Sequence, residues 1–527
     1  MENRHSNTPT LEQRFVTHFP GDESGSTLPR QTPKVFYSLV KPTPVPSPQI
    51  LLWSENAAAL LDWPRPLDRK GWEADVLAGN LELPGSRPYA LRYGGHQFGH
   101  WAGQLGDGRA IALGELKNSQ GALWELQLKG AGPTAYSRRA DGRAVLRSSL
   151  REFLCSEAMF HLGVPTTRAL SLVTTGELVL RDMFYDGHPE WEAGAITTRF
   201  APSFIRFGNF EILAASGEVE NLKRLADYTI ATHFPELLAP HGESLYLTWF
   251  KEISRRTARL MVEWLRVGFV HGVMNTDNMS ILGLTIDYGP YGWLDVYDPG
   301  FTPNTTDASQ KRYRFSQQPG IGLWNLGRLA EALAPLMPDP EALEGAFEVY
   351  RETFADSYQS MMRHKLGLSS WKGEADDILL RDLDQVLCST EMDMTLFYRA
   401  LTLELSPSGA GFSAAMREAF YSLPTEKLEA DMSAWLARYR ERVLAEGRPI
   451  DKVKAMMNQA NPYFILRNYL VQEALDALAR GDETVCQELL SALRTPYESN
   501  AVTQKFSGRR PEWARQKPGC SDLSCSS

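Results

Sequence analysis

The stretch His271-Gly-Val-Met-Asn-Thr-Asp-Asn278 is followed by an apolar run, residues 281–286, which ends in Asp287-Tyr-Gly289. We expect the apolar run to form a short strand that separates an asparagine from an aspartate. Kinase folds use this arrangement to bring an amide oxygen and a carboxylate oxygen onto one magnesium ion. The sequence therefore predicts Asn278 and Asp287 as metal ligands, although residues of these types also occupy ordinary turns.

The same stretch departs from the pattern of many small-molecule kinases, which read His-Gly-Asp-x-x-x-x-Asn with the aspartate as the base. Here Val273 follows the His-Gly pair, so the usual base is absent. The nearest carboxylate is Asp277, directly beside Asn278, and we expect it to do this work. A displaced base indicates altered geometry at the reacting phosphorus, but it does not say which group is transferred.

Three upstream features fit the nucleotide-binding half of such a fold. The glycines of Gln104-Leu-Gly-Asp-Gly-Arg109 would let backbone N–H groups approach phosphate oxygens closely. Lys129 ends a predicted strand and could hold phosphates, while Glu152 on the next predicted helix could orient it. Taken singly, each has an ordinary alternative: a hairpin turn, an edge-strand lysine and a solvated helix face.

Two arginines are candidates for a second phosphate contact. Arg199 and Arg206 are seven residues apart in Thr198-Arg-Phe-Ala-Pro-Ser-Phe-Ile-Arg206, where the chain enters its helical half. Their guanidinium groups could clamp a phosphate that points the other way along the cleft. They could also be ordinary surface or lobe-bridging arginines.

The periodicity of apolar residues changes along the chain. Residues 88–200 predict short strands, including a hairpin made by residues 110–117 and 122–129, and one helix over residues 145–162. Beyond residue 210 the spacing is helical, with long helices over residues 246–267 and 323–336. The predicted fold class is α+β: a protein-kinase-like bilobal fold with a small sheet-rich N-lobe carrying one key helix, and a large, mostly helical C-lobe.

We expect four parts: a flexible N-terminal arm (1–34), a nucleotide-binding N-lobe (35–200), a helical C-lobe with the catalytic and metal-binding loops (201–500) and a polar C-terminal tail (501–527). The tail contains Cys520 and Cys525. Their thiols, on a polar and mobile segment, are candidates for oxidation. The alternative is that both cysteines are incidental.

Composition narrows the class of protein. Of 527 residues, 43% are apolar, which is enough for a large core, and the formal net charge is -9 without a basic block, which argues against nucleic acid as a partner. No stretch reaches the roughly 20 apolar residues of a membrane helix, and the polar N-terminus is not a secretory signal. Five widely spaced cysteines are not a disulfide framework, so we expect a cytoplasmic protein.

Longer motifs resemble those of the selenoprotein O family, the kinase-fold protein adenylyltransferases. The chain looks like a bacterial-type member that contains cysteine. The motifs are Arg92-Tyr-Gly-Gly-His-Gln-Phe-Gly-His-Trp-Ala-Gly103, Gln127-Leu-Lys-Gly-Ala-Gly-Pro-Thr-Ala-Tyr-Ser-Arg138, Arg151-Glu-Phe-Leu-Cys-Ser-Glu-Ala-Met159, residues 271–280 and the tail ending Cys525-Ser-Ser527. The resemblance extends from about residue 36 to the end of the chain. Some members carry selenocysteine where this chain has Cys525.

The resemblance implies an activity. Members bind ATP in a flipped orientation with Mg²⁺ or Mn²⁺, so that AMP passes to Ser, Thr or Tyr hydroxyl groups of proteins and pyrophosphate leaves. By this resemblance Asp277 is the proton acceptor and Asn278 and Asp287 are the metal ligands. The implied nucleotide contacts are Gly106, Gly108, Arg109, Lys129 (oriented by Glu152), Asp141, Gly142, Arg199, Arg206 and Asp287. Two other readings stay open from the residues alone: a small-molecule phosphotransferase, and a pseudokinase scaffold that binds nucleotide without catalysis.

Overall fold

The computed structural model describes residues 9–184, 186–239, 244–337, 339–405 and 412–524. One half of the molecule is built on a nine-stranded sheet with the order β2-β3-β5-β8-β9-β11-β10-β4, to which β1 adds by pairing with β8. Its strands are β1 (Leu11–Glu12), β2 (Gly21–Asp22), β3 (Tyr37–Leu39), β4 (Gln49–Trp53), β5 (Tyr89–Leu91), β8 (Ala110–Lys117), β9 (Leu123–Lys129), β10 (Arg168–Arg181) and β11 (Glu190–Ala201). The predicted hairpin over residues 110–129 is confirmed as β8 and β9, which pair antiparallel.

One long helix packs on this sheet. Helix α4 (Leu146–His161) contacts β10 and β11, and Leu150, Phe153 and Leu154 are completely buried on its inner side. Their spacing is the helical repeat that predicted the helix. The helix ends where Gly163 adopts a left-handed backbone, φ 80°, which glycine accepts without strain.

Residues 9–34, which we expected to form a flexible arm, pack against the sheet. Leu11 pairs with Leu116 across β1 and β8, and Phe15 of α1 (Arg14–His18) stacks on Tyr89 with ring centroids 5.7 Å apart. The expectation rested on polar composition. A few apolar side chains are enough to anchor the segment, because each buried aromatic residue removes a large apolar area from water.

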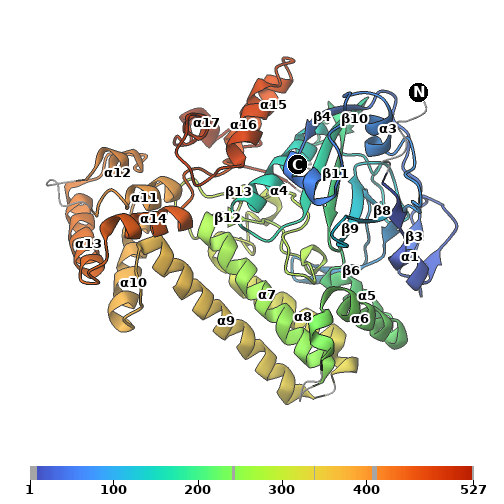
Figure 1. Ribbon diagram of the computed structural model, residues 1–527, viewed down its shortest axis with the longest axis horizontal. Coiled ribbons are helices and arrows are strands. Elements are labelled where there is room, and N and C mark those ends of the chain that lie inside the picture. The colour runs from blue at the N-terminus through green and yellow to red at the C-terminus, as the bar shows by residue number, and fades with distance from the viewer. Residues whose placement is uncertain (1–8, 185, 240–243, 338, 406–411, 525–527) are drawn as a thin grey trace.

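The other half of the molecule is helical. Helix α7 (Leu245–Val267) lies at its centre and runs beside α9 (Pro340–Leu366), as Figure 1 shows. The remaining helices are α5 (Phe207–Ala215), α6 (Val219–His233), α8 (Gln318–Leu333), α10 (Glu374–Cys388), α11 (Met394–Ala400), α12 (Ala414–Glu418), α13 (Glu426–Leu444), α14 (Ile450–Ala460), α15 (Asn468–Leu478), α16 (Thr484–Leu493) and α17 (Ala501–Phe506). A sheet-rich lobe with one key helix, joined to a larger helical lobe, confirms the predicted α+β, kinase-like fold.

The apolar run over residues 281–286 is not a strand, and this prediction was wrong. Ile281 and Ile286 are buried in the core, while Gly283 turns the chain with φ 71° and Thr285 makes a single bridge to Thr166. Burial therefore explains the apolar run without a sheet ladder. Two short strands do form on either side of residues 271–291. They are β12 (Phe269–Val270) and β13 (Gly292–Trp293), which pair antiparallel.

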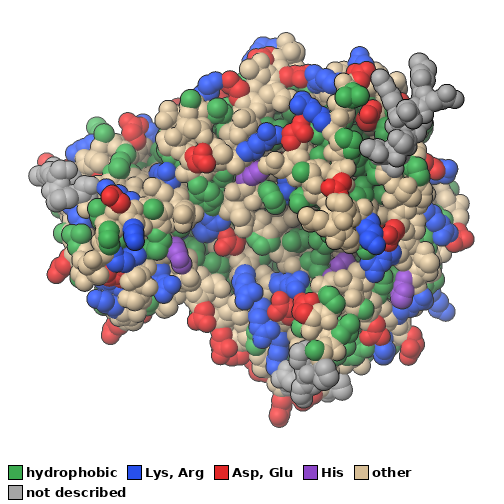
Figure 2. Space-filling model, viewed as in Figure 1, with side chains coloured by type: hydrophobic (Ala, Val, Ile, Leu, Met, Phe, Trp, Pro, Cys, Tyr) green, Lys and Arg blue, Asp and Glu red, His purple; other side chains and the backbone are tan. Residues whose placement is uncertain are grey.

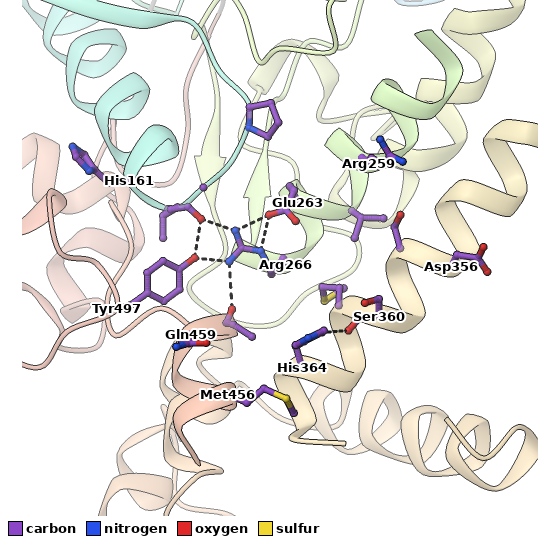
Figure 3. A pocket seen from close by; sticks show the side chains of 17 residues that line it. His161, Arg259, Glu263, Arg266, Asp356, Ser360, His364, Met456, Gln459 and Tyr497 are labelled. Carbon is purple, nitrogen blue, oxygen red and sulfur yellow. Dashed lines mark hydrogen bonds and ion pairs between the residues drawn. The ribbon is translucent and has the colours of Figure 1, made fainter. Parts of the chain in front are cut away.

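Arg266, in the last turn of α7, ties the two lobes together. Its guanidinium donates to the carbonyl oxygens of Leu162 at 2.6 Å and Ala460 at 3.3 Å, and to the hydroxyl of Tyr497 at 2.5 Å. These partners follow α4, end α14 and lie beyond α16. Figure 3 shows the Arg266 side chain pointing toward Tyr497 at this junction. A surface cavity of about 850 Å³ opens beside this junction.

The surface is charged and mixed. Figure 2 shows Lys and Arg side chains interspersed with Asp and Glu over the visible face. Within the described parts of the chain, none of the helices combines the length and apolar character needed to span a membrane.

Candidate active site

A cleft of about 1000 Å³ lies between the two lobes and is lined by most of the residues singled out in the sequence. The N-lobe contributes Gly106, Gly108, Arg109, Lys129, Asp141, Gly142 and Arg199, and the catalytic loop and its continuation contribute Asp277, Asn278 and Asp287. Arg206 and Glu152 are buried directly behind this lining, where Arg206 contacts Asp287 and Glu152 contacts Lys129.

Lys129 and Glu152 form the ion pair that their order in the chain predicted. Lys129 Nζ lies 2.7 Å from Glu152 Oε2, and the residues are only 8% and 4% exposed. Strand β9 is flanked by β8 and β11, so Lys129 is not an edge-strand residue, and Glu152 is not on a solvated helix face. Burial lowers the pKa of Lys129, and Glu152 opposes that shift, which keeps a cation pointed into the cleft.

Asp287 is the point where three cations meet. Its Oδ1 accepts from Arg199 Nη1 at 2.6 Å and lies 3.5 Å from Lys129 Nζ, while its Oδ2 accepts from Arg206 Nη1 at 2.5 Å. Both arginines are almost fully buried, so the alternative of surface arginines is wrong. Burial alone would raise the pKa of Asp287, but Arg206, Arg199 and Lys129 together hold that pKa well below its usual range.

A second layer that the sequence analysis missed holds the arginines. Arg199 Nε donates to Gln127 Oε1 at 2.7 Å, and Gln127 Nε2 donates to Asp107 Oδ2 at 3.3 Å. The other Asp107 oxygen lies 3.8 Å from Arg206 Nη2, and burial raises the pKa of Asp107. Strand alternation could have indicated Gln127 as a site residue, because Gln127 lies on the same face of β9 as Lys129.

The candidate base, Asp277, is covered by a short hairpin. Asp277 is 7% exposed, and burial raises its pKa to about 7. A hydrogen bond from Gln97 Nε2 to Asp277 Oδ2, at 3.2 Å, opposes this rise by stabilising the carboxylate. Its Oδ1 is buried and has no hydrogen-bond partner within the described residues. Gln97 ends strand β6 (Gly94–Gln97), which pairs with β7 (His100–Gln104). A carboxylate with this pKa suits proton acceptance near neutral pH.

The hairpin is attached to the catalytic loop by a polar network that the sequence analysis also missed. His96 Nδ1 lies 2.7 Å from Glu211 Oε1, and Glu211 Oε2 accepts from the hydroxyl of Thr276. The backbone N–H of His96 donates to the same hydroxyl at 2.7 Å. Thr276 precedes Asp277 in the single helical turn Thr276–Asn278, so the network fixes the position of the base.

The glycine positions are set by close packing. A side chain on Gly106 would meet the ring of Tyr136 at 2.4 Å, and one on Gly142 would meet the carbonyl oxygen of Gly132 at 2.1 Å. Gly106 and Gly142 also have positive φ, 135° and 69°. Asp141 lies at the rim of the cleft, where Arg181 Nη2 donates to it at 2.7 Å. Neither position has room for a side chain, so glycine is required at both.

The predicted metal ligands fit a magnesium ion that arrives with a nucleotide. Asn278 Nδ2 donates to the carbonyl oxygen of Val273 at 2.9 Å, which leaves Oδ1 for coordination. Across the described residues, no group of three or more His, Cys, Asp or Glu side chains is placed to hold a metal. One amide oxygen and one carboxylate are nevertheless sufficient for Mg²⁺, because phosphate oxygens and water supply its remaining ligands.

Comparisons with known proteins agree with this chemistry. Residues 27–494 match the family described as protein adenylyltransferase SelO. The protein nucleotidyltransferase YdiU of Nitrosospira multiformis is 53% identical over 543 residues, which cover 98% of this chain and 96% of that protein. The protein of the same name in Xanthomonas axonopodis pv. citri is 54% identical over 519 residues, covering 98% and 99%.

Among solved structures, ROP2 from Toxoplasma gondii, described as having a protein-kinase fold and no enzymatic activity, aligns with 67% of this chain and 84% of its own. The identity is 14% and the TM-score 0.23. A score at this level adds nothing to the fold assignment, which rests on the order of strands and helices described above.

Proposed function

The chain belongs to the SelO family of protein adenylyltransferases, and we propose that it transfers AMP from ATP to Ser, Thr or Tyr hydroxyl groups of target proteins in the cytoplasm. Mg²⁺ is the proposed metal and Mn²⁺ the alternative. In this proposal residues 35–200 bind the nucleotide and residues 201–500 supply the catalytic loop. The observation that carries it is the convergence of Lys129, Arg199 and Arg206 on Asp287 at the inner end of the cleft.

This cluster supports a flipped nucleotide. Three buried cations form a site for the outer phosphates, which would leave the α-phosphate toward the catalytic loop. Binding then exchanges partners, because the arginines pass from Asp287 to phosphate oxygens and Asp287 becomes available to the metal. When bound, Mg²⁺ neutralises phosphate charge and fixes the phosphate geometry.

The chain's own residues account for the proton and the leaving group. Asp277 accepts the proton of the acceptor hydroxyl while the hydroxyl oxygen forms a bond to the α-phosphorus. The bond from that phosphorus to the bridging oxygen of the β-phosphate breaks, and pyrophosphate leaves. Lys129, oriented by Glu152, stabilises negative charge on the phosphates. Gly106, Gly108, Arg109, Asp141 and Gly142 line the cleft where the rest of the nucleotide would lie.

The two alternatives have less support. Val273 stands where many small-molecule kinases have the base, which weighs against a small-molecule phosphotransferase. A non-catalytic scaffold would not need the assembled set of Lys129, Glu152, Asp277 and Asp287, and the relatives are named as nucleotidyltransferases.

Labelled ATP tests the proposal. We expect protein substrates to retain the α-phosphate label and not the γ-phosphate label; γ-label on the product would mean phosphotransfer instead.

A second test replaces Arg199 or Arg206 with methionine and measures nucleotide binding by calorimetry. Each change should weaken the binding of ATP more than the binding of AMP. Arg259→Met, on the outer face of α7, is the control and should change neither affinity. ATP affinity unchanged in both variants would contradict the flipped pose.

A further inference from the structure

Two arginines lie against one tryptophan next to the hairpin that covers Asp277. The guanidinium carbon of Arg312 is 4.6 Å from the ring centroid of Trp324, and that of Arg328 is 5.1 Å from it. Stacking on an aromatic ring holds a guanidinium in a fixed plane. Both arginines and Trp324 are partly exposed. We call these three residues the arginine–tryptophan surface.

The charge on this surface is only partly balanced. No carboxylate lies within ion-pair distance of Arg312 in the described parts of the chain, whereas Arg328 pairs with Glu331, which is mostly exposed. The nearby carboxylate of Asp307 is occupied, because it accepts the backbone N–H groups of Arg312 at 2.9 Å and Tyr313 at 2.7 Å. Arg328 also lies close enough to the buried Glu211 to oppose the rise that burial causes in the pKa of that carboxyl, so the net positive charge of the surface is carried by Arg312.

Several donors of this surface lack a partner. Nε and Nη2 of Arg312 and Nε of Arg328 are buried and make no hydrogen bond of good geometry among the residues described, although the Tyr313 hydroxyl lies close to the Arg312 guanidinium. Buried donors without acceptors carry a free-energy cost, which a ligand oxygen can relieve after a small side-chain shift. A carboxylate matches a guanidinium group in shape as well as charge.

The surface adjoins the reacting end of the cleft. A side chain on Gly99, at the tip of the hairpin, would lie 3.4 Å from the guanidinium carbon of Arg312. Gln97, two residues earlier, donates to Asp277. Tyr313, next to Arg312, accepts from Phe98 N–H at 3.0 Å and donates to Asn275 Oδ1 at 2.7 Å. Gln97 and Gly99 are two residues apart, which is at most about 7 Å of extended chain. The hairpin therefore links Asp277 to Arg312 over a few residues' length, and we take two to four residues as the spacing to test.

Aromatic side chains extend the same face. His96 packs against Trp324 and Trp101, with ring centroids 5.7 Å and 5.2 Å away, and Trp101 is 40% exposed. Exposed aromatic residues beside arginines are typical of protein-binding surfaces.

We propose that the arginine–tryptophan surface binds Asp or Glu side chains of the acceptor protein, so that the enzyme modifies hydroxyl groups in acidic segments. This inference rests on the proposed function and specifies its substrate class. It assigns Arg312 and Arg328 as specificity-determining residues that contact the substrate two to four residues away from the modified hydroxyl. The occupant is a protein segment, and its negative charge is what the surface selects.

Matched peptides test this proposal. Each pair carries one acceptor hydroxyl, flanked at two to four residues either by Glu or by Gln, and AMP incorporation is followed with α-labelled ATP. We expect wild-type kcat/KM to favour the Glu peptide by about fivefold, the change given by one strong ion pair at a partly exposed site. Arg312→Met, alone or with Arg328→Met, should reduce the preference to within about twofold through KM for peptide, with KM for ATP unchanged. Arg259→Met is the matched control and should keep the full preference.

A binding measurement separates this proposal from the proposed function. Fluorescence anisotropy of the labelled Glu peptide reports binding whether or not AMP is transferred, and we expect the Arg312→Met enzyme to bind it about fivefold more weakly. Arg312→Lys keeps the charge but loses the planar stack and should be intermediate; ATP binding shows that each variant is folded. Equal binding of Glu and Gln peptides by wild type, or unchanged binding by Arg312→Met, would overturn the acidic-segment proposal. Peptide binding without AMP incorporation would contradict the proposed function and leave this surface standing.

Discussion

Asp287 determines the electrostatics of the cleft at the scale of single residues. Its two oxygens hold Arg199 and Arg206, and both guanidinium groups are buried where water does not solvate them. A buried charge is tolerated only when it is paired, so the carboxylate is structural as well as a candidate metal ligand. The phosphates of a bound nucleotide would take over this structural role.

Asp287→Ala should therefore destabilise the protein as well as remove activity. Removal of one partner from a buried ion pair costs about 3–5 kcal/mol of unfolding free energy, because the remaining charges are left uncompensated. Denaturant unfolding measures this loss, and added ATP should restore part of it.

Asp141→Ala is the matched control, since it removes a half-exposed carboxylate that is paired with Arg181. An exposed pair contributes only about 0–1 kcal/mol. If both variants lose the same stability, the arginine cluster does not depend on Asp287.

The sequence was a good guide to residues whose role follows from chain order. Lys129, Glu152, Asn278 and Asp287 were predicted from their succession along strand, helix and loop, and the structure brings Lys129, Glu152 and Asp287 into contact. Asp107 and Gln127 were not predicted as supports of the arginines. Their role depends on contacts across the sheet, which no local spacing reports.

At the scale of elements, the β6–β7 hairpin controls the space around the base. Gly95 has no side chain, and a Cβ there would lie 2.8 Å from Asp277 Oδ1 and 3.0 Å from Asp277 Cβ. The hairpin and the catalytic loop are in van der Waals contact at this point, so neither moves without the other.

Gly95→Ala should lower AMP transfer with little change in ATP affinity, because the added methyl group displaces Asp277 and not the phosphate-binding residues. A displacement of about 1 Å costs on the order of 100-fold in rate. Steady-state kinetics and calorimetry measure the two quantities. Gly327→Ala in α8, where a Cβ meets no atom within 4 Å, is the control. Transfer equal to wild type in Gly95→Ala would show that the hairpin is not in contact with the working base.

Strands β8 and β9 contain a second titratable pair, Glu115 and Glu125, which lie opposite each other in register. Burial, with the neighbouring Glu115 adding to it, raises the pKa of Glu125 to about 8. The folded protein therefore holds this proton over a pH range in which the unfolded chain has lost it. The stabilisation is complete below about pH 4.5 and is lost as the pH rises to about 8.

Glu125→Gln should remove that pH dependence. The variant gains stability relative to wild type as the pH rises from about 5 to 8, by at most about 1.4 kcal/mol per pH unit. Thermal unfolding across this range measures the difference. Asp431→Asn on the exposed side of α13 should show no such trend. Parallel pH profiles for wild type and Glu125→Gln would mean that Glu125 is ionised in the folded protein.

Element boundaries were predictable where periodicity was strong. Helix α4 and the β8–β9 hairpin begin and end within one residue of the expected positions. The apolar run over residues 281–286 was misassigned, because a short apolar segment fits a buried turn as well as a strand.

At the scale of the whole molecule, both terminal segments complete the fold. The described C-terminal residues lie across the two lobes: Leu523 pairs with Asn304 after the metal-binding loop, and the Ser524 hydroxyl donates to the carbonyl oxygen of Met183 in the N-lobe. Polar composition led us to expect a mobile tail, since composition does not report a few specific anchors.

Cys520 is accordingly not the accessible thiol that the sequence suggested. It is buried, its carbonyl oxygen accepts from Asn468 Nδ2 at 2.9 Å, and burial raises the pKa of its thiol to about 11. The thiolate is the reactive form, so this cysteine should be almost inert at neutral pH. Cys525 lies outside the described residues, and its redox role stays a prediction.

The anchor at Leu523 should control the reactivity of Cys520. Leu523 is fully buried, its N–H donates to the carbonyl oxygen of Pro303 at 3.0 Å, and its own carbonyl accepts from Thr305 N–H at 2.8 Å. Leu523→Asp places a charge in that apolar site, which should release the tail and expose the thiol. In a Cys388→Ser, Cys525→Ser background, where Cys155 and Cys486 are buried, we expect labelling of Cys520 by a thiol reagent to accelerate by at least about tenfold. Ser521→Ala, at a partly exposed neighbour, should label as slowly as the background protein. Equal labelling rates in all three proteins would show that the tail is held by contacts other than Leu523, and fast labelling of the background protein would show that it is not held at all.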